Sequence, residues 1–161
     1  MNIFKKIKLL PRIIKGTLAL INVRDLQING EYEEALALLE KYKDLFEGKN
    51  FEYHLNRGRI LLNSRSDFKT AIEEYLQGIS LLAPDKRRMN PNWREYYLAW
   101  AKYAIGWCYY ALDEKDVAKN WRTESEKHDF NNEKIPENIR SAFPMRWHDG
   151  NNLKVDENDR S

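Results

Sequence analysis

The sequence has little of several residue types, and each shortage narrows the possible folds. Among 161 residues there are one cysteine, seven glycines and five prolines. A single cysteine, Cys108, excludes an intramolecular disulfide and a zinc site built from several cysteines, and it favours a reducing cytoplasm as the location. Few glycines and prolines, with a charged fraction of 32%, are typical of a soluble helical protein rather than a β-sandwich or a disordered chain.

Long hydrophobic runs are also absent from the sequence. The best candidate, residues 16–23, is followed directly by Arg24 and Asp25, whereas a transmembrane helix needs about 18 or more consecutive apolar residues. Proline and basic residues interrupt the approach to this run, and no clear small-residue cleavage site follows it. We therefore expect neither a membrane span nor a secretory signal peptide.

Sequence signals for catalysis, cofactors and metals are missing as well. His54, His128 and His148 are scattered, and no Cys–His or Ser–His spacing indicates a nucleophile. The stretch 147–150 contains a histidine and an aspartate, but a metal site needs three or four converging groups. No glycine-rich phosphate loop occurs. We predict that the protein is not an enzyme, and we assign no catalytic residue, cofactor or metal ligand.

The net charge of +2 is distributed unevenly along the chain. Residues 1–15 carry five lysines and arginines and no acid, so the remainder is close to −3. A protein that binds nucleic acid through its body would spread positive charge over that body. Nucleic acid is therefore not an expected partner.

Apolar residues recur at three- and four-residue steps over most of the chain, which predicts helices. The expected helices cover residues 12–29, 32–46, 51–63, 68–82, 93–112 and 116–128, with a further short turn at 137–143. Pro11 is expected to end a preceding segment, and Pro84 to end the fourth of these helices. Asn92 with Glu95 is expected to cap the start of the longest helix.

A short pattern recurs three times where two expected helices are joined. Its copies at 29–36, 65–72 and 112–118 each contain a turn-forming residue, an acidic residue and a small alanine. The alanines, Ala35, Ala71 and Ala118, lie 36 and 47 residues apart, and a polar insertion accounts for the longer spacing. Small residues at these places would let paired helices approach closely.

Over residues 12–128 the chain resembles the tetratricopeptide repeat family, whose helix–turn–helix units have a period near 34 residues. The matching positions are Tyr32 and Phe68, the three alanines, Pro84, Gly58, Gly106 and Tyr109. The third unit departs from the pattern, because Lys115 replaces the turn aromatic, and no proline closes the first unit. The resemblance implies an all-α protein, an α-solenoid of about three antiparallel helical hairpins with capping segments at both ends.

The expected organisation has three parts. Residues 1–11 form a basic, amphipathic N-terminal cap, residues 12–147 the repeat domain, and residues 148–161 a polar, mobile tail. The first part has two interpretations, because a basic amphipathic segment either packs as a cap on the first hairpin or lies on an anionic membrane surface. Its short apolar run favours the cap.

Two sets of residues are predicted to bind a partner. Aromatic residues at three- and four-residue steps on the longest helix are Trp100, Tyr103, Trp107 and Tyr110. Polar residues at corresponding steps on the first helices of units one and two are Arg24, Gln27, Arg59 and Asn63. In the resembled family the first helix of each unit faces the groove, and such residues often bind a peptide's carboxylates or backbone. Burial of the aromatics between hairpins, and ordinary solvation of the polar side chains, are the alternatives.

These features predict a non-catalytic adaptor or scaffold that binds a protein or peptide through a concave groove. Two alternatives stay open. One is a dedicated inhibitor of a single partner, such as the cytoplasmic immunity protein of a secreted toxin, which would suit a compact single domain. The other is a peripheral membrane adaptor that uses residues 1–15.

Overall fold

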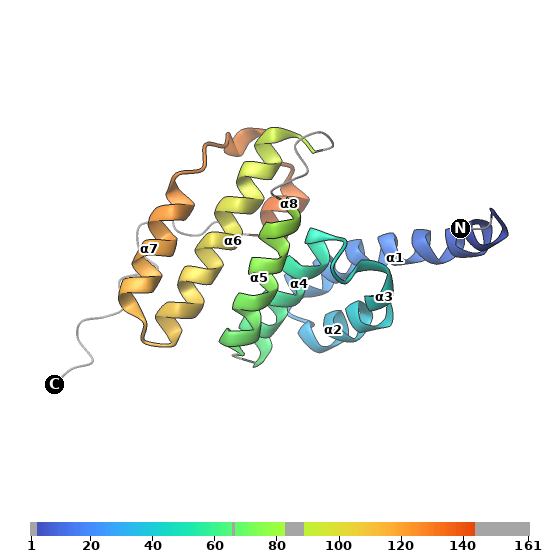
Figure 1. The fold of residues 1–161 in the computed structure, drawn as a ribbon, viewed down its shortest axis with the longest axis horizontal. Coiled ribbons are helices and arrows are strands. Elements are labelled where there is room, and N and C mark those ends of the chain that lie inside the picture. The colour runs from blue at the N-terminus through green and yellow to red at the C-terminus, as the bar shows by residue number, and fades with distance from the viewer. Residues whose placement is uncertain (1–2, 66, 83–88, 144–161) are drawn as a thin grey trace.

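A computed structural model describes residues 3–65, 67–82 and 89–143, and within these ranges it contains helices and no strand (Figure 1). The elements in order are α1 (Ile3–Asn29), α2 (Tyr32–Lys41), α3 (Lys43–Phe46), α4 (Phe51–Ile60), a π-helical turn η1 (Leu61–Arg65), α5 (Phe68–Leu82), α6 (Pro91–Ala111), α7 (Lys115–Glu126), a 3-10 turn η2 (Asn132–Lys134) and α8 (Glu137–Ala142). The predicted all-α class is confirmed.

Most predicted helices agree with the structure within a few residues, and two predictions about their ends are wrong. Pro11 does not end a helix but lies inside α1, which is continuous from Ile3 to Asn29. Pro11 is exposed, so water can hydrate the carbonyl group that its missing N–H leaves unpaired. At the start of α6 the capping residue is Asn90, whose side chain accepts a hydrogen bond from the Asn92 N–H at 2.9 Å. Pro84 and residues 148–161 lie outside the described residues.

The α1–α2 and α6–α7 turns have the same backbone geometry. Gly30 and Asp113 both adopt a positive φ, of 82° and 62°. The next residue in each turn, Glu31 or Glu114, donates its N–H to the carbonyl five positions back, at 2.8 and 2.9 Å. This is the hydrogen bond of a Schellman helix end, which needs a left-handed residue before it. The two sequence copies therefore build one kind of turn, with aspartate replacing glycine in the second.

Small residues lie where helices pack closely. Ala35, Ala71 and Ala118 are all buried, as predicted. A Cβ atom added at Gly106 of α6 would lie 3.1 Å from the carbonyl oxygen of Ala118 in α7. This distance is shorter than most contacts that Cβ atoms make in proteins. A side chain at position 106 would therefore require α7 to move by a few tenths of an ångström.

Replacing Ala71 by leucine should lower the free energy of unfolding by about 1–3 kcal/mol, because added methylene groups have no space in this core. Ala71 is fully buried on α5, which packs against both α4 and α6. Urea denaturation measures the change. The matched control is Ala37→Leu at an exposed position of α2, which should change stability by less than about 0.5 kcal/mol. Equal midpoints for the Ala71 variant and the wild type would contradict the packing.

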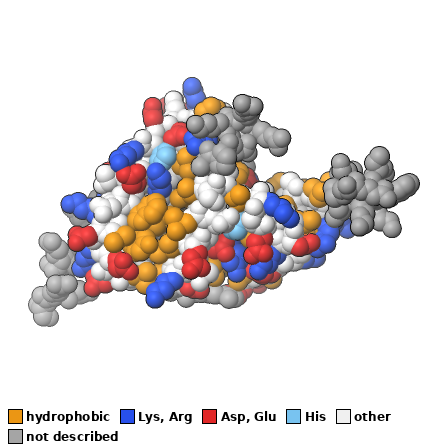
Figure 2. Space-filling model, viewed as in Figure 1, with side chains coloured by type: hydrophobic (Ala, Val, Ile, Leu, Met, Phe, Trp, Pro, Cys, Tyr) orange, Lys and Arg blue, Asp and Glu red, His pale blue; other side chains and the backbone are white. Residues whose placement is uncertain are grey.

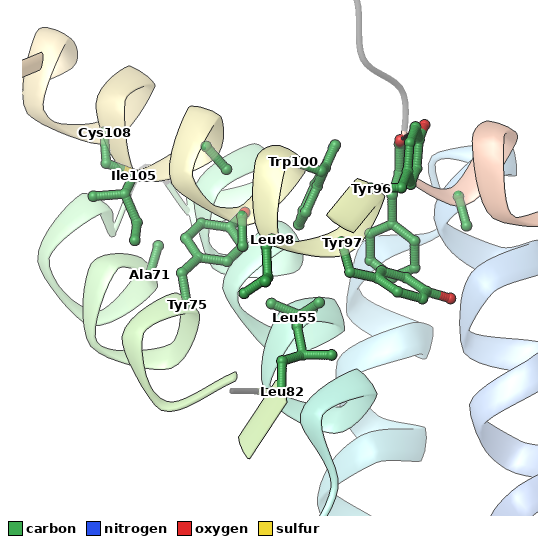
Figure 3. Packing of buried hydrophobic residues seen from close by; sticks show 14 of the residues in the cluster. Leu55, Ala71, Tyr75, Leu82, Tyr96, Tyr97, Leu98, Trp100, Ile105 and Cys108 are labelled. Carbon is green, nitrogen blue, oxygen red and sulfur yellow. Dashed lines mark hydrogen bonds between the residues drawn. The ribbon is translucent and has the colours of Figure 1, made fainter. Parts of the chain in front are cut away.

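The main core lies between α4, α5, α6 and α8 (Figure 3). Leu55, Leu82 and Leu98 come from three different helices and meet in its interior. The chain then returns after α7, so that Ile135, Ile139 and Phe143 join the same cluster. α8 also packs against α1. A second cluster joins α1, α2 and α4 and includes Val23, Leu39, Tyr53 and Ile60.

Candidate functional site

The C-terminal half of α6 and the first turns of α7 enclose a groove of about 240 Å³, which we call the aromatic groove. Its lining residues are Tyr103, Gly106, Trp107 and Tyr110 of α6 and Lys115, Ala118, Lys119 and Arg122 of α7. Hydrophobic side chains gather over this part of the two helices on the face shown in Figure 2. The groove is therefore a surface feature with a largely apolar wall.

Its shape follows from the close contact between α6 and α7. Gly106 and Ala118 form the floor of the groove, because neither has a large side chain. The aromatic side chains beside them form its wall. Trp107 keeps 37% of its surface exposed, and its ring stacks on that of Tyr110 at 5.8 Å with an interplanar angle of 17°. Stacking restricts the motion of both rings, so that they would lose little side-chain entropy when a ligand packs against them.

Positive charge borders this aromatic wall along α7. Lys115 lies 3.4 Å from Asp113, and Arg122 lies 3.1 Å from Glu126. Lys119 makes no ion pair with any residue that the structure describes. Burial raises the pKa of the Tyr103 hydroxyl, and the nearby Arg122 charge opposes that shift. An apolar surface beside an available ammonium group suits a ligand that carries both an apolar group and a negative charge.

The structure brings three of the four predicted aromatic residues together. Tyr103 and Tyr110 line the groove beside Trp107, but Trp100 does not. Trp100 is only 5% exposed and packs edge-on against Tyr75 at 5.5 Å and Phe143 at 4.8 Å. The prediction that Trp100 lies on an open surface is wrong, because the segment leading out of α8 covers it.

Arg24 and Gln27 lie on the side of α1 that faces α4. Arg24 pairs with Glu52, and Gln27 is buried and donates a hydrogen bond to the Asn56 Oδ1 atom at 2.7 Å. Arg24 also borders a cavity of about 320 Å³ that includes Trp93 of α6 and residues of α8. The prediction of a solvent-facing Gln27 is wrong, because its amide crosslinks two helices.

Arg59 and Asn63 lie at the end of α4 and in η1. Arg59 is 9% exposed, so the prediction that it projects into solvent is wrong. Its charge acts on the buried Tyr75 hydroxyl: burial raises the pKa of Tyr75 well above its usual value, and Arg59 opposes the shift. Asn63 is exposed and donates a hydrogen bond to the Arg59 carbonyl at 2.9 Å. Neither residue lines the aromatic groove.

The covering role of the C-terminal segment and the contribution of α7 to the groove were not predicted from the sequence. A signal for the first was present, because Ile135, Ile139, Ala142 and Phe143 recur at helical spacing and all four are buried. The cations of α7 are one turn or so apart, at Lys115, Lys119 and Arg122, which indicates a single helix face. The sequence does not show which helix packs beside this row of cations, because that depends on tertiary packing.

Two histidines form hydrogen-bonded pairs with glutamates. The His54 Nε2 atom accepts the Gly48 N–H at 2.9 Å, so the proton lies on Nδ1, which donates to Glu74 at 2.7 Å. His128 lies 2.6 Å from Glu95 and borders a cavity of about 500 Å³. The neighbouring Ser125 hydroxyl is buried and donates to a backbone carbonyl at 2.7 Å, which is a structural role.

Glu74→Gln should destabilise the protein by about 1–2 kcal/mol at neutral pH, because Glu74 bonds both His54 and Arg57. Burial raises the pKa of this carboxyl, but the His54 hydrogen bond and the Arg57 charge outweigh it, so that the net pKa lies below the ordinary 4.5. A lowered pKa in the folded state contributes stability above about pH 4.5 that is lost as pH falls through the lowered value.

The difference in unfolding free energy between wild type and Glu74→Gln should therefore shrink on acidification, as measured by urea denaturation across the acidic range. The control is Glu73→Gln, the exposed neighbour, which should show a small difference at every pH. A wild-type advantage that stays constant into strong acid would contradict the assigned role of the carboxylate.

Among the residues that the structure describes, no three histidine, cysteine, aspartate or glutamate side chains converge as metal ligands would. Within the same residues, none of the helices has both the length and the apolar character for crossing a bilayer. Comparison of the chain with protein-family models, curated proteins and solved structures finds no match.

Proposed function

We propose that this protein is a non-catalytic binding module that holds a protein or peptide partner in the aromatic groove, as an adaptor or scaffold. The observation that carries the proposal is the stacked, partly exposed Trp107 next to Lys119, which has no ion pair among the described residues. Tryptophan and tyrosine dominate the energetics of protein interfaces, because they supply a large, stiff contact area with a polar group.

We also propose that the helices form tetratricopeptide-like units. Three pairs of helices support this arrangement: α1 with α2, α4 with α5, and α6 with α7. The repeated turn geometry at Gly30 and Asp113 and the three buried alanines support it further. Helical pairs stacked in this way leave exposed faces between elements, and such faces are the usual binding surfaces of repeat proteins.

The partner surface proposed here differs from the concave groove expected from sequence. The side of α6 that carries Tyr97 and Trp100 is covered by Phe143, whose ring lies 5.3 Å from that of Tyr97 and 4.8 Å from that of Trp100. The groove on α6 and α7 has no such cover among the described residues. We propose the cytoplasm as the compartment, since the single Cys108 is buried and needs no oxidising environment.

Site-specific photo-crosslinking in the native cell tests this function. A benzophenone amino acid at position 107 should capture a partner, and the same probe at the exposed Ala37 of α2 should not capture it. Mass spectrometry of the crosslinked peptide should show an apolar side chain close to an acidic one. Identical products from both positions would contradict the proposal, as would a specific partner captured from Ala37 alone.

A further inference from the structure

The side of α1 that points away from the body is apolar. Gly16, Leu20 and Val23 face the rest of the protein and are buried. At 100° per residue, Ile14, Leu18 and Ile21 fall on the opposite side of the helix, and they are 53%, 54% and 45% exposed. We call these three residues the outer stripe. α1 thus has apolar side chains on both sides, and the fold buries only one of these sides.

Exposed apolar side chains are concentrated on this helix. Of the seven large hydrophobic residues that are exposed in the described ranges, five belong to α1: Ile13, Ile14, Leu18, Ile21 and Ile28. Isolated exposed hydrophobics are normal, but a contiguous row on one helix face marks an interaction surface. Figure 1 shows the N-terminal turns of α1 reaching beyond α2 and α3, and the stripe follows these turns, on the part of α1 whose Gly16 packs against Phe46 of α3.

The charge of this region identifies the kind of surface that fits it. Residues 1–24 contain six lysines and arginines and no acid, and the first acidic residue is Asp25. Arg12 and Arg24 pair with Asp44 and Glu52, and Lys15 is exposed. A parallel pair of α1 helices packed stripe to stripe would bring these cations together, which is unfavourable. An anionic surface would attract them.

We propose that α1 lies along an anionic lipid bilayer, with the outer stripe inserted among the acyl chains and the lysines at the headgroups. A helix that combines a solvent-facing apolar row with lysines and arginines is a common form of an interfacial anchor, and the part of α1 before Asp25 has this composition. The outer stripe runs from Ile14 to Ile21, which is two turns or about 10 Å of helix. The exposed Asp25 ends the inserted part, because its carboxylate would be repelled by anionic headgroups.

Vesicle co-sedimentation of the full chain tests this proposal. The protein should sediment with vesicles of phosphatidylcholine and phosphatidylserine, much less with phosphatidylcholine alone, and added salt should weaken the binding. Ile14→Ser with Leu18→Ser should reduce binding at least about tenfold, because both side chains are exposed and leave the core unchanged. The control is Leu76→Ser, which removes an exposed hydrophobic side chain from α5, outside the aromatic groove, and should bind like wild type.

Charge reversal of Lys15, an exposed lysine of α1, gives a second test that does not alter the apolar stripe. Lys15→Glu should reduce binding to the anionic vesicles about tenfold or more. No sedimentation of the wild type would overturn the proposal, as would equal binding to both lipid compositions or equal losses in the stripe and control variants. A wild-type dimer that the stripe variant converts to a monomer, with vesicle binding unchanged, would assign the stripe to a second copy of the chain.

Discussion

Phe143→Ala is expected to lower the free energy of unfolding by about 3–5 kcal/mol, a large part of the stability of a domain of this size. Phe143 directly follows α8 and is fully buried. Its ring packs edge-on against Tyr97 at 5.3 Å and against Trp100 at 4.8 Å. Its carbonyl accepts a hydrogen bond from the Tyr96 hydroxyl at 2.6 Å. Removing the ring leaves a cavity between α8 and α6.

Urea denaturation, followed by circular dichroism, measures this loss, and amide hydrogen exchange shows where it arises. Exchange should speed up most in α8 and in the N-terminal half of α6, which Phe143 joins. The control is Phe143→Leu, which keeps most of the volume and should cost less than about 1.5 kcal/mol. An alanine variant as stable as the leucine variant would show that α8 is not held on α6 by this ring.

The sequence was sufficient to predict the helices, because the hydrophobic period and the turn residues are local signals. The segment from Phe68 to Leu82 was predicted at both ends. The prediction for Pro11 was wrong because a proline inside a helix destabilises it without always ending it. Pro11 lies at an exposed position of the long helix α1, which continues through it. Asn92 was predicted as the cap in place of Asn90, because the two asparagines lie two residues apart and have the same side-chain amide.

The site was less predictable, because exposure depends on what packs against a face. Trp100 and Trp107 lie on the same helix two turns apart, and the same helical spacing predicted that both are exposed. Phe143 covers the first and nothing described covers the second, although a helical period alone makes them equivalent. Gln27 and Arg59 were similarly placed on the correct helices, but hydrogen bonding and packing with neighbouring helices bury them.

The proposed groove places the largest binding effect at Trp107. Truncating a partly exposed tryptophan that stacks on Tyr110 removes the most exposed aromatic side chain of the groove, and it leaves the buried α6–α7 crossing at Gly106 and Ala118 intact. Trp107→Ala should therefore weaken binding of the photo-crosslinked partner by about 2 kcal/mol or more, which corresponds to roughly 30-fold. Most of this change should appear as faster dissociation.

Lys119→Glu should act differently, because a long-range charge acts mainly on encounter. It should slow association and change the dependence of the rate on salt, whereas the Trp107 variant should keep the wild-type salt dependence. Surface plasmon resonance separates the two rate constants. Ile28→Ala, which removes an exposed side chain from α1, is the control and should bind like wild type. If Trp107→Ala keeps its helical content and its affinity, the partner does not use the aromatic groove, because no other residue of this surface combines its exposed area with a stacked ring.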